Sequence, residues 1–256
     1  MADLGVRLTV DGPIARVVLD RPEVRNAQTP AMWLALAEFG TSLPSEVRVV
    51  VVSGEGVSFS AGLDRRLFLG EPVDGAESPL ALGARPPEEV HDIIAGYQAG
   101  FSWLRRPEFV SIAAVQGHAI GAGFQLALAC DLRVVTPDVK FSMREPALGL
   151  VPDLGGTQPL VQLIGYSRAL EICATSRWVE AEEALQWGLA NIVVPVEELQ
   201  ATVTDLTAAL LAPPHGAITE TKALLAGASS RGYEAQLTAE REAQARRLTD
   251  LLGSSG

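Results

Sequence analysis

The sequence predicts an α/β fold in which a mixed core is followed by an α-helical C-terminal region. Val47–Val52 is a nearly continuous β-branched run, which is typical of a strand covered on both faces, and Val110–Val115 is a second apolar run. Strand and helix patterns alternate up to about Val135, and helix patterns dominate afterwards. We therefore expect a core over residues 1–195 and a helical region over residues 196–256.

Length and composition limit the class of protein. The 256 residues fit one large domain, or one domain with a small appendage. The net charge of −11 argues against nucleic acid or an anionic membrane as the main partner. No apolar run reaches the roughly 18 residues that span a bilayer, no signal-peptide pattern is present, and Cys130 and Cys173 form no disulfide framework. We expect a soluble cytoplasmic protein.

The first elements follow from local turn and cap signals. The alternating segment Val6–Val10, the Asp11-Gly12 turn and the segment Ile14–Leu19 predict a β-hairpin. A loop over residues 21–27 leads to a helix, and Thr29 is placed to accept a hydrogen bond at its N-terminus.

The next part of the chain alternates turn-rich and regular segments. Gly54–Asp64 is rich in turn residues and directly follows a buried strand. Gly70–Glu89 is rich in Gly, Pro and acidic residues without clear periodicity, so we expect a mobile surface loop. Val90–Leu104 predicts a helix that ends before Pro107.

A glycine-spaced turn at the centre of the chain predicts a site for an oxyanion. Gly117, Gly121 and Gly123 follow the strand Val110–Val115, and the Ala-rich segment Phe124–Cys130 predicts a buried helix. The start of a helix carries unpaired N–H groups and a partial positive charge, which favour a carbonyl oxygen that becomes negative.

The remaining elements are mostly helices. A strand is expected at Leu132–Val135, a short one at Phe141 and a last one at Ile192–Val194. Ser167 is expected to cap one of the helices, and the expected helical segments are Thr157–Leu163, Ala169–Ala174, Ala181–Trp187, Glu197–Leu211, Ile218–Leu225 and Tyr233–Leu251.

Four segments together resemble one known family, the crotonase superfamily or enoyl-CoA hydratase/isomerase family. Their order and spacing span roughly residues 6–251, and the set is more specific than any one piece. The segments are Arg21-Pro22 with Arg25-Asn26-Ala27, Phe59–Asp64, Gly117–Asp131, and Leu148–Pro152 with Gly155–Gln158.

The resemblance implies a fold, a ligand and an assembly. The fold is a spiral of ββα units with C-terminal helices used for trimer contacts, so a homotrimer or a dimer of trimers is expected. The ligand is an acyl thioester of coenzyme A, with no covalently bound cofactor and no metal, and the implied activity is an enoyl-CoA hydratase or isomerase of fatty acid metabolism.

The resemblance also assigns roles to individual residues. The backbone N–H groups of Leu63 and Ala122 correspond to the pair that holds the thioester oxygen. The positions that contact coenzyme A correspond to Arg25, Ala27, Ala61 and Asp64, the last of which is expected to fix its loop.

The chain departs from the family's hydratases at the first of their two glutamates. Glu145 matches the second glutamate, but the first position is Gln125, which cannot accept a proton at neutral pH. Asp153 stands where dienoyl-CoA isomerases of the family have an aspartate, but these isomerases also carry an acid at the position of Gln125. Moving a double bond requires only one carboxylate, so the sequence favours isomerisation slightly over hydration. The chain also ends where many relatives continue into another helix.

Each assignment has a simpler alternative. The simpler interpretation of Glu145 is a surface ion pair with Arg144. For Asp153 it is a turn or helix-cap residue, and for Gln125 it is a side chain that bonds the backbone instead of holding a water. Lys222 is expected to be solvated rather than to reach a phosphate of coenzyme A. For the whole protein, the alternative to an enzyme is an acyl-CoA-binding protein without turnover.

Overall fold

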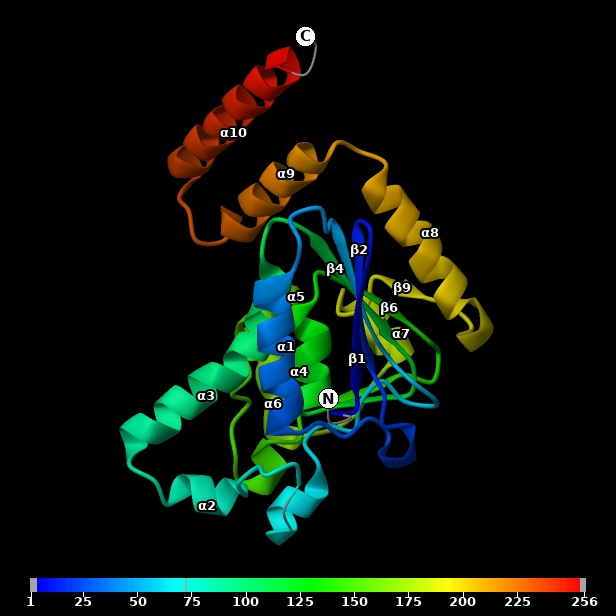
Figure 1. Ribbon diagram of the computed structural model, residues 1–256, viewed down its shortest axis with the longest axis vertical. Coiled ribbons are helices and arrows are strands. Elements are labelled where there is room, and N and C mark those ends of the chain that lie inside the picture. The colour runs from blue at the N-terminus through cyan, green and yellow to red at the C-terminus, as the bar shows by residue number, and fades with distance from the viewer. Residues whose placement is uncertain (1–3, 72, 254–256) are drawn as a thin grey trace.

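The computed structural model describes residues 4–71 and 73–253 and has a mixed α/β architecture with two sheets (Figure 1). The larger sheet has the order β1-β2-β3-β4-β6-β9, and all its neighbours are parallel except the β1–β2 hairpin. Its strands are β1 (Val6–Asp11), β2 (Ile14–Leu19), β3 (Val49–Gly54), β4 (Val110–Val115), β6 (Leu132–Val135) and β9 (Ile192–Val193). The smaller sheet contains β5 (His118–Ile120), β7 (Lys140–Ser142) and β8 (Val179–Glu180).

The helices follow the strands in the order that a ββα spiral requires, as in β4–β5–α4 and β6–β7–α5. The α-helices are α1 (Pro30–Ser42), α2 (Pro79–Gly83), α3 (Pro87–Ser102), α4 (Ala122–Ala129), α5 (Thr157–Ile164), α6 (Tyr166–Thr175), α7 (Ala181–Gln186), α8 (Leu199–Leu211), α9 (His215–Ala228) and α10 (Tyr233–Gly253). Short 3₁₀ turns lie at Pro22–Val24, Arg65–Leu69, Trp103–Arg105, Pro146–Leu148 and Val196–Glu198.

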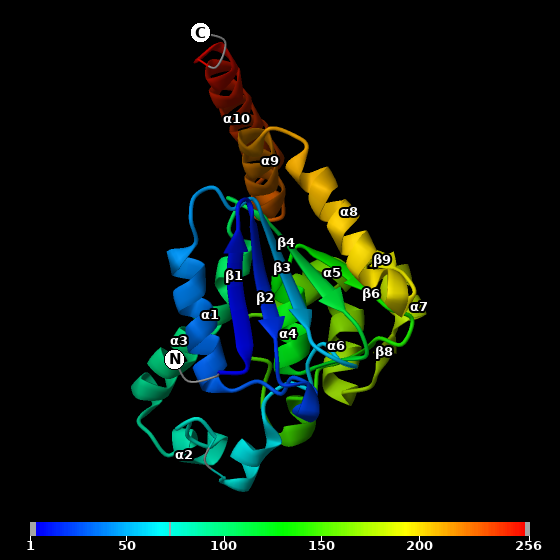
Figure 2. The same cartoon turned by 45° about the vertical axis from the view of Figure 1, so that its right-hand side comes forward.

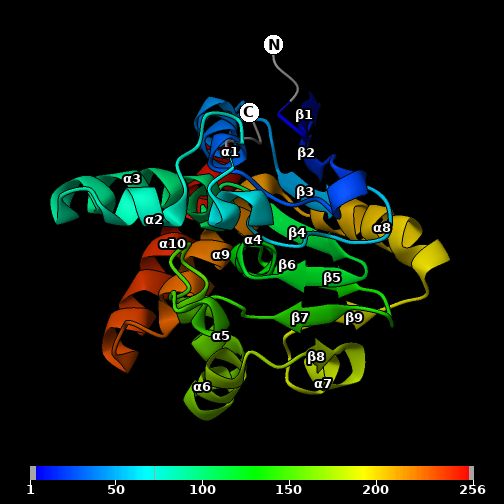
Figure 3. The ribbon, with the colours of Figure 1, turned by 90° about the horizontal axis from the view of Figure 1, so that it is seen from below.

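The two faces of the larger sheet are covered by different helices, because alternate residues of a strand point to opposite faces. Val49 and Val51 of β3 pack in one cluster with Val203 of α8. Val50 and Val52 belong to the main core, which also includes residues of α1, α3 and α4. Figures 1 and 2 show α8 on one side of the sheet and α1 and α4 on the other. Seen from below, β5, β7 and β8 lie side by side near α4 (Figure 3).

Two local signals placed elements correctly and one did not. The hairpin turns at Gly12, whose φ of 51° suits glycine, and Thr29 Oγ1 accepts from the N–H of Met32 at 3.3 Å. The expectation that Ser167 caps a helix is wrong. Gly165, with φ 79°, separates α5 from α6, so α6 already begins at Tyr166.

The expected loop over residues 70–89 contains more regular structure than the sequence indicated. Ser78 Oγ accepts from the N–H of Ala81 at 3.1 Å and caps α2, which has Pro79 in its first turn. The next helix, α3, begins at Pro87 instead of Val90. Most side chains of this segment are exposed, and residue 72 lies outside the described residues.

The two last helices form an arm that projects from the core (Figures 1 and 2). α9 and α10 pack on each other. In the described chain α9 has no fully buried residue and α10 has only Ala243. Such an arm needs specific anchors, because it buries little apolar surface of its own against the core.

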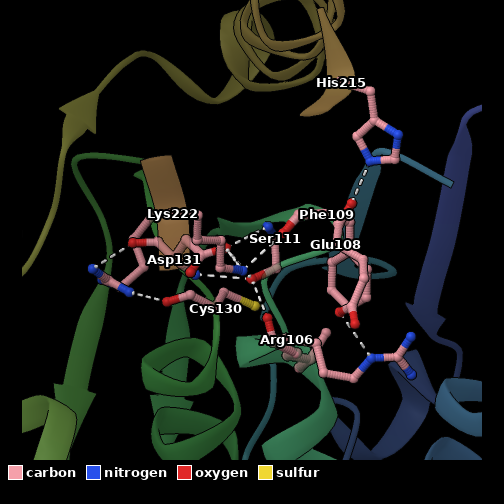
Figure 4. Close-up of polar contacts among 10 residues, drawn as sticks. Arg106, Glu108, Phe109, Ser111, Cys130, Asp131, His215 and Lys222 are labelled. Atoms are coloured by element: carbon pink, nitrogen blue, oxygen red, sulfur yellow. Dashed lines mark hydrogen bonds and ion pairs between the residues drawn. The ribbon is translucent and has the colours of Figure 1, made fainter. Parts of the chain in front are cut away.

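A buried lysine supplies one of these anchors (Figure 4). Lys222 Nζ donates to Asp131 Oδ2 at 2.6 Å and to the Phe109 carbonyl at 2.8 Å, and only 11% of its side chain is exposed. Asp131 Oδ2 also accepts from the Ser111 backbone N–H at 2.7 Å. A ring nitrogen of His215 lies 2.6 Å from the Glu108 carbonyl oxygen. The expectation of a solvated Lys222 is therefore wrong: the ammonium group holds α9 on the core.

We predict that Lys222→Met lowers the free energy of unfolding by about 3 kcal/mol, because it leaves the largely buried Asp131 carboxylate without its ion-pair partner. Adding Asp131→Asn should restore part of this loss. Urea denaturation measures the effect. The control is Lys140→Met, since the Lys140–Glu180 pair spans 3.9 Å between exposed side chains and should contribute less than about 0.5 kcal/mol. Equal effects of the two lysine variants would contradict the anchoring role.

Candidate active site

The N-terminus of α4 is open, and its first residue is Ala122. All eight residues of this helix are buried, and Gly121 before it has φ 51° and ψ −118°, a conformation that suits only glycine. No side chain caps this end, and in the described residues no acceptor lies within hydrogen-bonding distance of the Ala122 N–H. This N–H is therefore free to bind a ligand oxygen.

Leu63 lies next to this helix start. Gln28 donates to the Gly62 carbonyl at 2.7 Å and accepts from the Asp64 N–H at 2.8 Å, so the N–H of Leu63 between them faces away from Gln28. A Cβ on Gly62 would lie 2.5 Å from the Ile120 carbonyl oxygen and 3.6 Å from the Ala122 nitrogen. The missing side chain at Gly62 thus allows the segments that carry Leu63 and Ala122 to meet.

The carboxylate of Glu145 lies against the same helix start. A Cβ on Gly121 would be 3.3 Å from Glu145 Oε1. Oε1 accepts from Gln125 Nε2 at 2.7 Å, whereas Oε2 is buried and has no partner among the described residues. Burial, and to a smaller extent the charge of Asp153, raise the pKa of Glu145. Arg144 does not pair with this carboxylate; its guanidinium lies over the Trp178 ring, 4.4 Å from the centroid.

Gln125 fixes Glu145 and a turn at the same time. Its Oε1 accepts from the N–H groups of Leu154 at 2.9 Å and Gly156 at 3.2 Å, so its Nε2 is the atom that donates to Glu145. Both acceptor positions of the amide oxygen are therefore used. Gln125 is fully buried, and a Cβ on Gly156 would lie 2.8 Å from its Cγ. The simpler interpretation, in which Gln125 bonds the backbone, agrees with these contacts, because the amide oxygen has no lone pair left to accept from a water.

Asp153 lies on the turn that Gln125 holds. Burial raises the pKa of the Asp153 carboxyl, and its charge contributes to the raised pKa of Glu145. The carbonyl oxygen of Asp153 accepts from Gln98 Nε2 of α3 at 2.7 Å. Nothing in the sequence pointed to Gln98, since a glutamine on an exposed helix surface usually points into water.

The residues assigned to coenzyme A lie on two loops that hold each other. The N–H of Ala61 donates to the carbonyl of Arg25 at 2.8 Å, and Arg25 itself is exposed. Ala27 is buried, and its carbonyl accepts from Arg21 Nη1 at 2.7 Å. The carboxylate of Asp64 is buried between the guanidinium groups of Arg21, at 2.9 Å, and Arg66, at 2.8 Å. The Asp64 contacts hold the two loops together.

The chain is similar to known proteins of one family. Residues 9–250 match the family model for enoyl-CoA hydratase/isomerase. The chain belongs to the enoyl-CoA hydratase/isomerase family. Family, fold class and the expectation of an enzyme of hydratase or isomerase type are thereby confirmed.

Among curated relatives of this family, the chain is 37% identical to mitochondrial Delta(3,5)-Delta(2,4)-dienoyl-CoA isomerase of Rattus norvegicus over 190 residues. That match covers 73% of this chain but only 57% of the rat protein. The chain is also 37% identical to carnitinyl-CoA dehydratase of Salmonella typhi over 210 residues, which cover 80% of this chain and 74% of the relative.

Solved structures of the family include a close match from Thermobifida fusca, a proposed enoyl-CoA hydratase. Its complex with CoA has a TM-score of 0.93 and 50% identity, covering 98% of this chain and 96% of the other. Its complex with acetoacetyl-CoA has a TM-score of 0.93 and 51% identity over 97% of this chain and 96% of the other. A neighbour that binds coenzyme A thus shares the fold over nearly the whole described chain.

The far end of α4 is closed by a residue that the sequence analysis missed. Arg133 is 1% exposed, and its guanidinium donates to the carbonyls of Cys130 at 2.7 Å and Ala127 at 3.3 Å at the end of α4, and to Leu189 at 2.6 Å. No carboxylate lies within ion-pair distance of it in the described ranges. A charged residue within the apolar strand Leu132–Val135 was the available signal.

Residues 4–71 and 73–253 contain no cluster of three His, Cys, Asp or Glu side chains arranged to bind a metal ion. None of the helices in this part of the chain has the length and apolar character that crossing a membrane requires.

We predict that Asp64→Asn lowers the free energy of unfolding at neutral pH by about 2 kcal/mol. Hydrogen bonds from Arg66, and further ones from Arg21, lower the pKa of Asp64 to about 2. Because this pKa lies below the ordinary value of about 3.9, the stabilisation of the fold by the ionised Asp64 is complete above that value and is lost as the pH falls toward 2. The difference between wild type and variant, measured by urea denaturation, should shrink over this window. Asp205→Asn, at an exposed position, serves as control. A difference that does not change with pH would contradict the prediction.

Proposed function

We propose that this protein moves carbon–carbon double bonds in enoyl-CoA and dienoyl-CoA thioesters. The N–H groups of Leu63 and Ala122 bind the thioester oxygen, and the carboxyls of Glu145 and Asp153 carry the protons. The main support is the hydrogen bonding of Gln125. Its amide oxygen already accepts from the N–H groups of Leu154 and Gly156, so an amide without a free acceptor stands where a hydratase needs a second acid. Its Nε2 donates to Oε1 of Glu145, whereas Oε2 has no partner among the described residues.

The reaction needs only proton transfers. A carboxylate removes a proton from the carbon next to the thioester, and the electron pair moves to the thioester oxygen, where two N–H groups stabilise the charge. Returning a proton to a more distant carbon shifts the double bonds, so substrate and product have the same composition. In a 3,5-dienoyl thioester the proton leaves carbon 2 and one is added at carbon 6. Glu145, as the carboxylate, takes the proton from carbon 2, and Asp153, in its acid form, supplies the one at carbon 6. The proton then passes from Glu145 back to Asp153 before the next turnover.

Hydration is the second candidate, and the similarity to the Thermobifida fusca protein favours it. Adding water requires one group to accept a proton from the water while another supplies one to the carbon. Gln125 can neither accept that proton nor offer its oxygen to the water. Glu145 alone would have to do both, so hydration should be the slower reaction. A binding protein without turnover is less well supported, because it has no use for a buried, unpartnered carboxylate oxygen.

The remaining assignments extend this proposal. Arg25, Ala27 and Ala61 on the paired loops contact the adenine and phosphate portions of coenzyme A, and Asp64 keeps these loops together. The α9–α10 arm is the surface through which the chain forms a homotrimer or a dimer of trimers. Sedimentation of the purified protein tests the assembly.

We predict that Glu145→Gln lowers turnover by at least about 100-fold, in line with the usual contribution of general acid–base catalysis. The variant should still bind an acyl-CoA, because the N–H groups and the coenzyme A loops are unchanged. The assay follows 2-enoyl-, 3-enoyl- and 3,5-dienoyl-CoA by absorbance, and calorimetry measures binding. The wild type should convert the 3-enoyl or 3,5-dienoyl substrate fastest.

The matched control is Glu182→Gln, which changes an exposed glutamate of α7 and should leave turnover unchanged. If wild type and Glu145→Gln bind acyl-CoA alike and neither turns over any of these substrates, the protein is a binder and the proposal is wrong. Preferred conversion of the 2-enoyl substrate would favour hydration instead.

We predict an acid limb in the pH profile of kcat/KM above the ordinary glutamate value of about 4.3. The active form of Glu145 is the carboxylate, and burial raises its pKa, so activity is lost as the pH falls through this raised value. Asp153 is in its acid form in the active enzyme, so Asp153→Asn should lower turnover and leave the position of this limb nearly unchanged. A limb at the ordinary glutamate value would contradict the role of the buried Glu145 carboxylate as the base.

A further inference from the structure

The carboxyl group of Asp153 has no side-chain contact that aims it. Among the described residues no other side chain bonds to or pairs with its carboxylate oxygens, and their one hydrogen bond comes from the backbone N–H of Asp153 itself. Its direction therefore depends on the main chain of the turn, in which Gly155 has φ 87°. A proton carrier must be held in place to be effective, so the contacts of this turn matter for catalysis.

Two glutamines hold the turn from opposite sides. Gln125 accepts from the N–H groups of Leu154 and Gly156, which follow Asp153. Leu154 also buries its side chain in the core. Gln98 donates to the carbonyl oxygen of Asp153 at 2.7 Å, so the peptide group that joins Asp153 to Leu154 is held by Gln98 at its oxygen and by Gln125 at its N–H.

The helix that carries Gln98 is a rigid support. α3 packs closely on α1, since a Cβ on Gly100 would lie 2.3 Å from the Trp33 carbonyl oxygen. The Trp33 ring makes edge contacts with Tyr97, at 5.2 Å between centroids, and with Phe101, at 6.0 Å. A side chain mounted on such a helix can fix the position of a neighbouring loop.

We propose that Gln98 is a positioning residue that ties α3 to the peptide of Asp153 and so aims its carboxyl group at the substrate. This inference rests on the proposed function, in which Asp153 carries a proton. Gln98 does not touch the reacting atoms; it acts through Asp153.

The test begins with Gln98→Met, which keeps the length of the side chain but removes its N–H donor. Loss of one neutral hydrogen bond corresponds to a decrease of about threefold to tenfold. We expect this decrease in kcat, with little change in KM and in the urea midpoint, because the side chain is exposed. Gln98→Lys restores a donor and should recover most of kcat. His91→Met, an exposed position on the same helix, should have no effect.

A double-mutant cycle with Asp153→Asn separates positioning from a structural role. If Gln98 acts through Asp153, Gln98→Met lowers kcat in the wild type but not further in Asp153→Asn. An equal decrease in both backgrounds would show a purely structural contact and overturn the inference.

The same cycle distinguishes failure of the inference from failure of the proposed function. A large loss in Asp153→Asn with no loss in Gln98→Met overturns the role of Gln98 and leaves the proposed function intact. If Asp153→Asn turns over as fast as the wild type, the proton-carrying role of Asp153 is wrong, and the positioning role of Gln98 is wrong with it.

Discussion

The site depends on how the two ends of one buried helix are satisfied. Every residue of α4 is buried, so neither end can turn to water for hydrogen bonds. At the C-terminal end, the guanidinium of Arg133 takes up the carbonyls of Ala127 and Cys130, and its charge complements the negative end of the helix dipole. At the N-terminal end no side chain accepts a hydrogen bond from the first N–H groups, so the N–H of Ala122 is available to a ligand.

A single amide organises the groups beside that open end. A second carboxylate in place of Gln125 would be buried next to Glu145, and two adjacent buried carboxylates oppose each other's ionisation. The amide avoids this repulsion, donates to Glu145 and accepts from two backbone N–H groups. The site thereby gains a fixed geometry for Glu145 and Asp153 and loses the acid pair that water addition uses.

The sequence predicted what depends on local patterns and missed what depends on distant contacts. The hairpin at Gly12, the cap at Thr29 and the buried strands follow from turn chemistry and apolar runs. Strands of two or three residues, β5 and β8, are too short to show a period. Lys222 and Gln98 resemble solvated helix residues, and only the tertiary fold brings Asp131 and the Asp153 carbonyl within their reach. The proposed catalytic residues come from motif spacing, which offered backbone bonding by Gln125 as one alternative but could not show that Leu154, Gly156 and Glu145 are its partners.

The contacts of Arg133 have a consequence for the order in which the molecule is assembled. Its guanidinium bonds the Leu189 carbonyl, and its backbone N–H bonds the side chain of Asn191, so partners almost sixty residues later in the chain complete its environment. During synthesis the guanidinium of Arg133 lies in an apolar segment without these partners until residues 189–191 have left the ribosome. α4 thus reaches its final packing only after most of the polypeptide has been made, which exposes the nascent chain to aggregation for longer than a locally closed helix would.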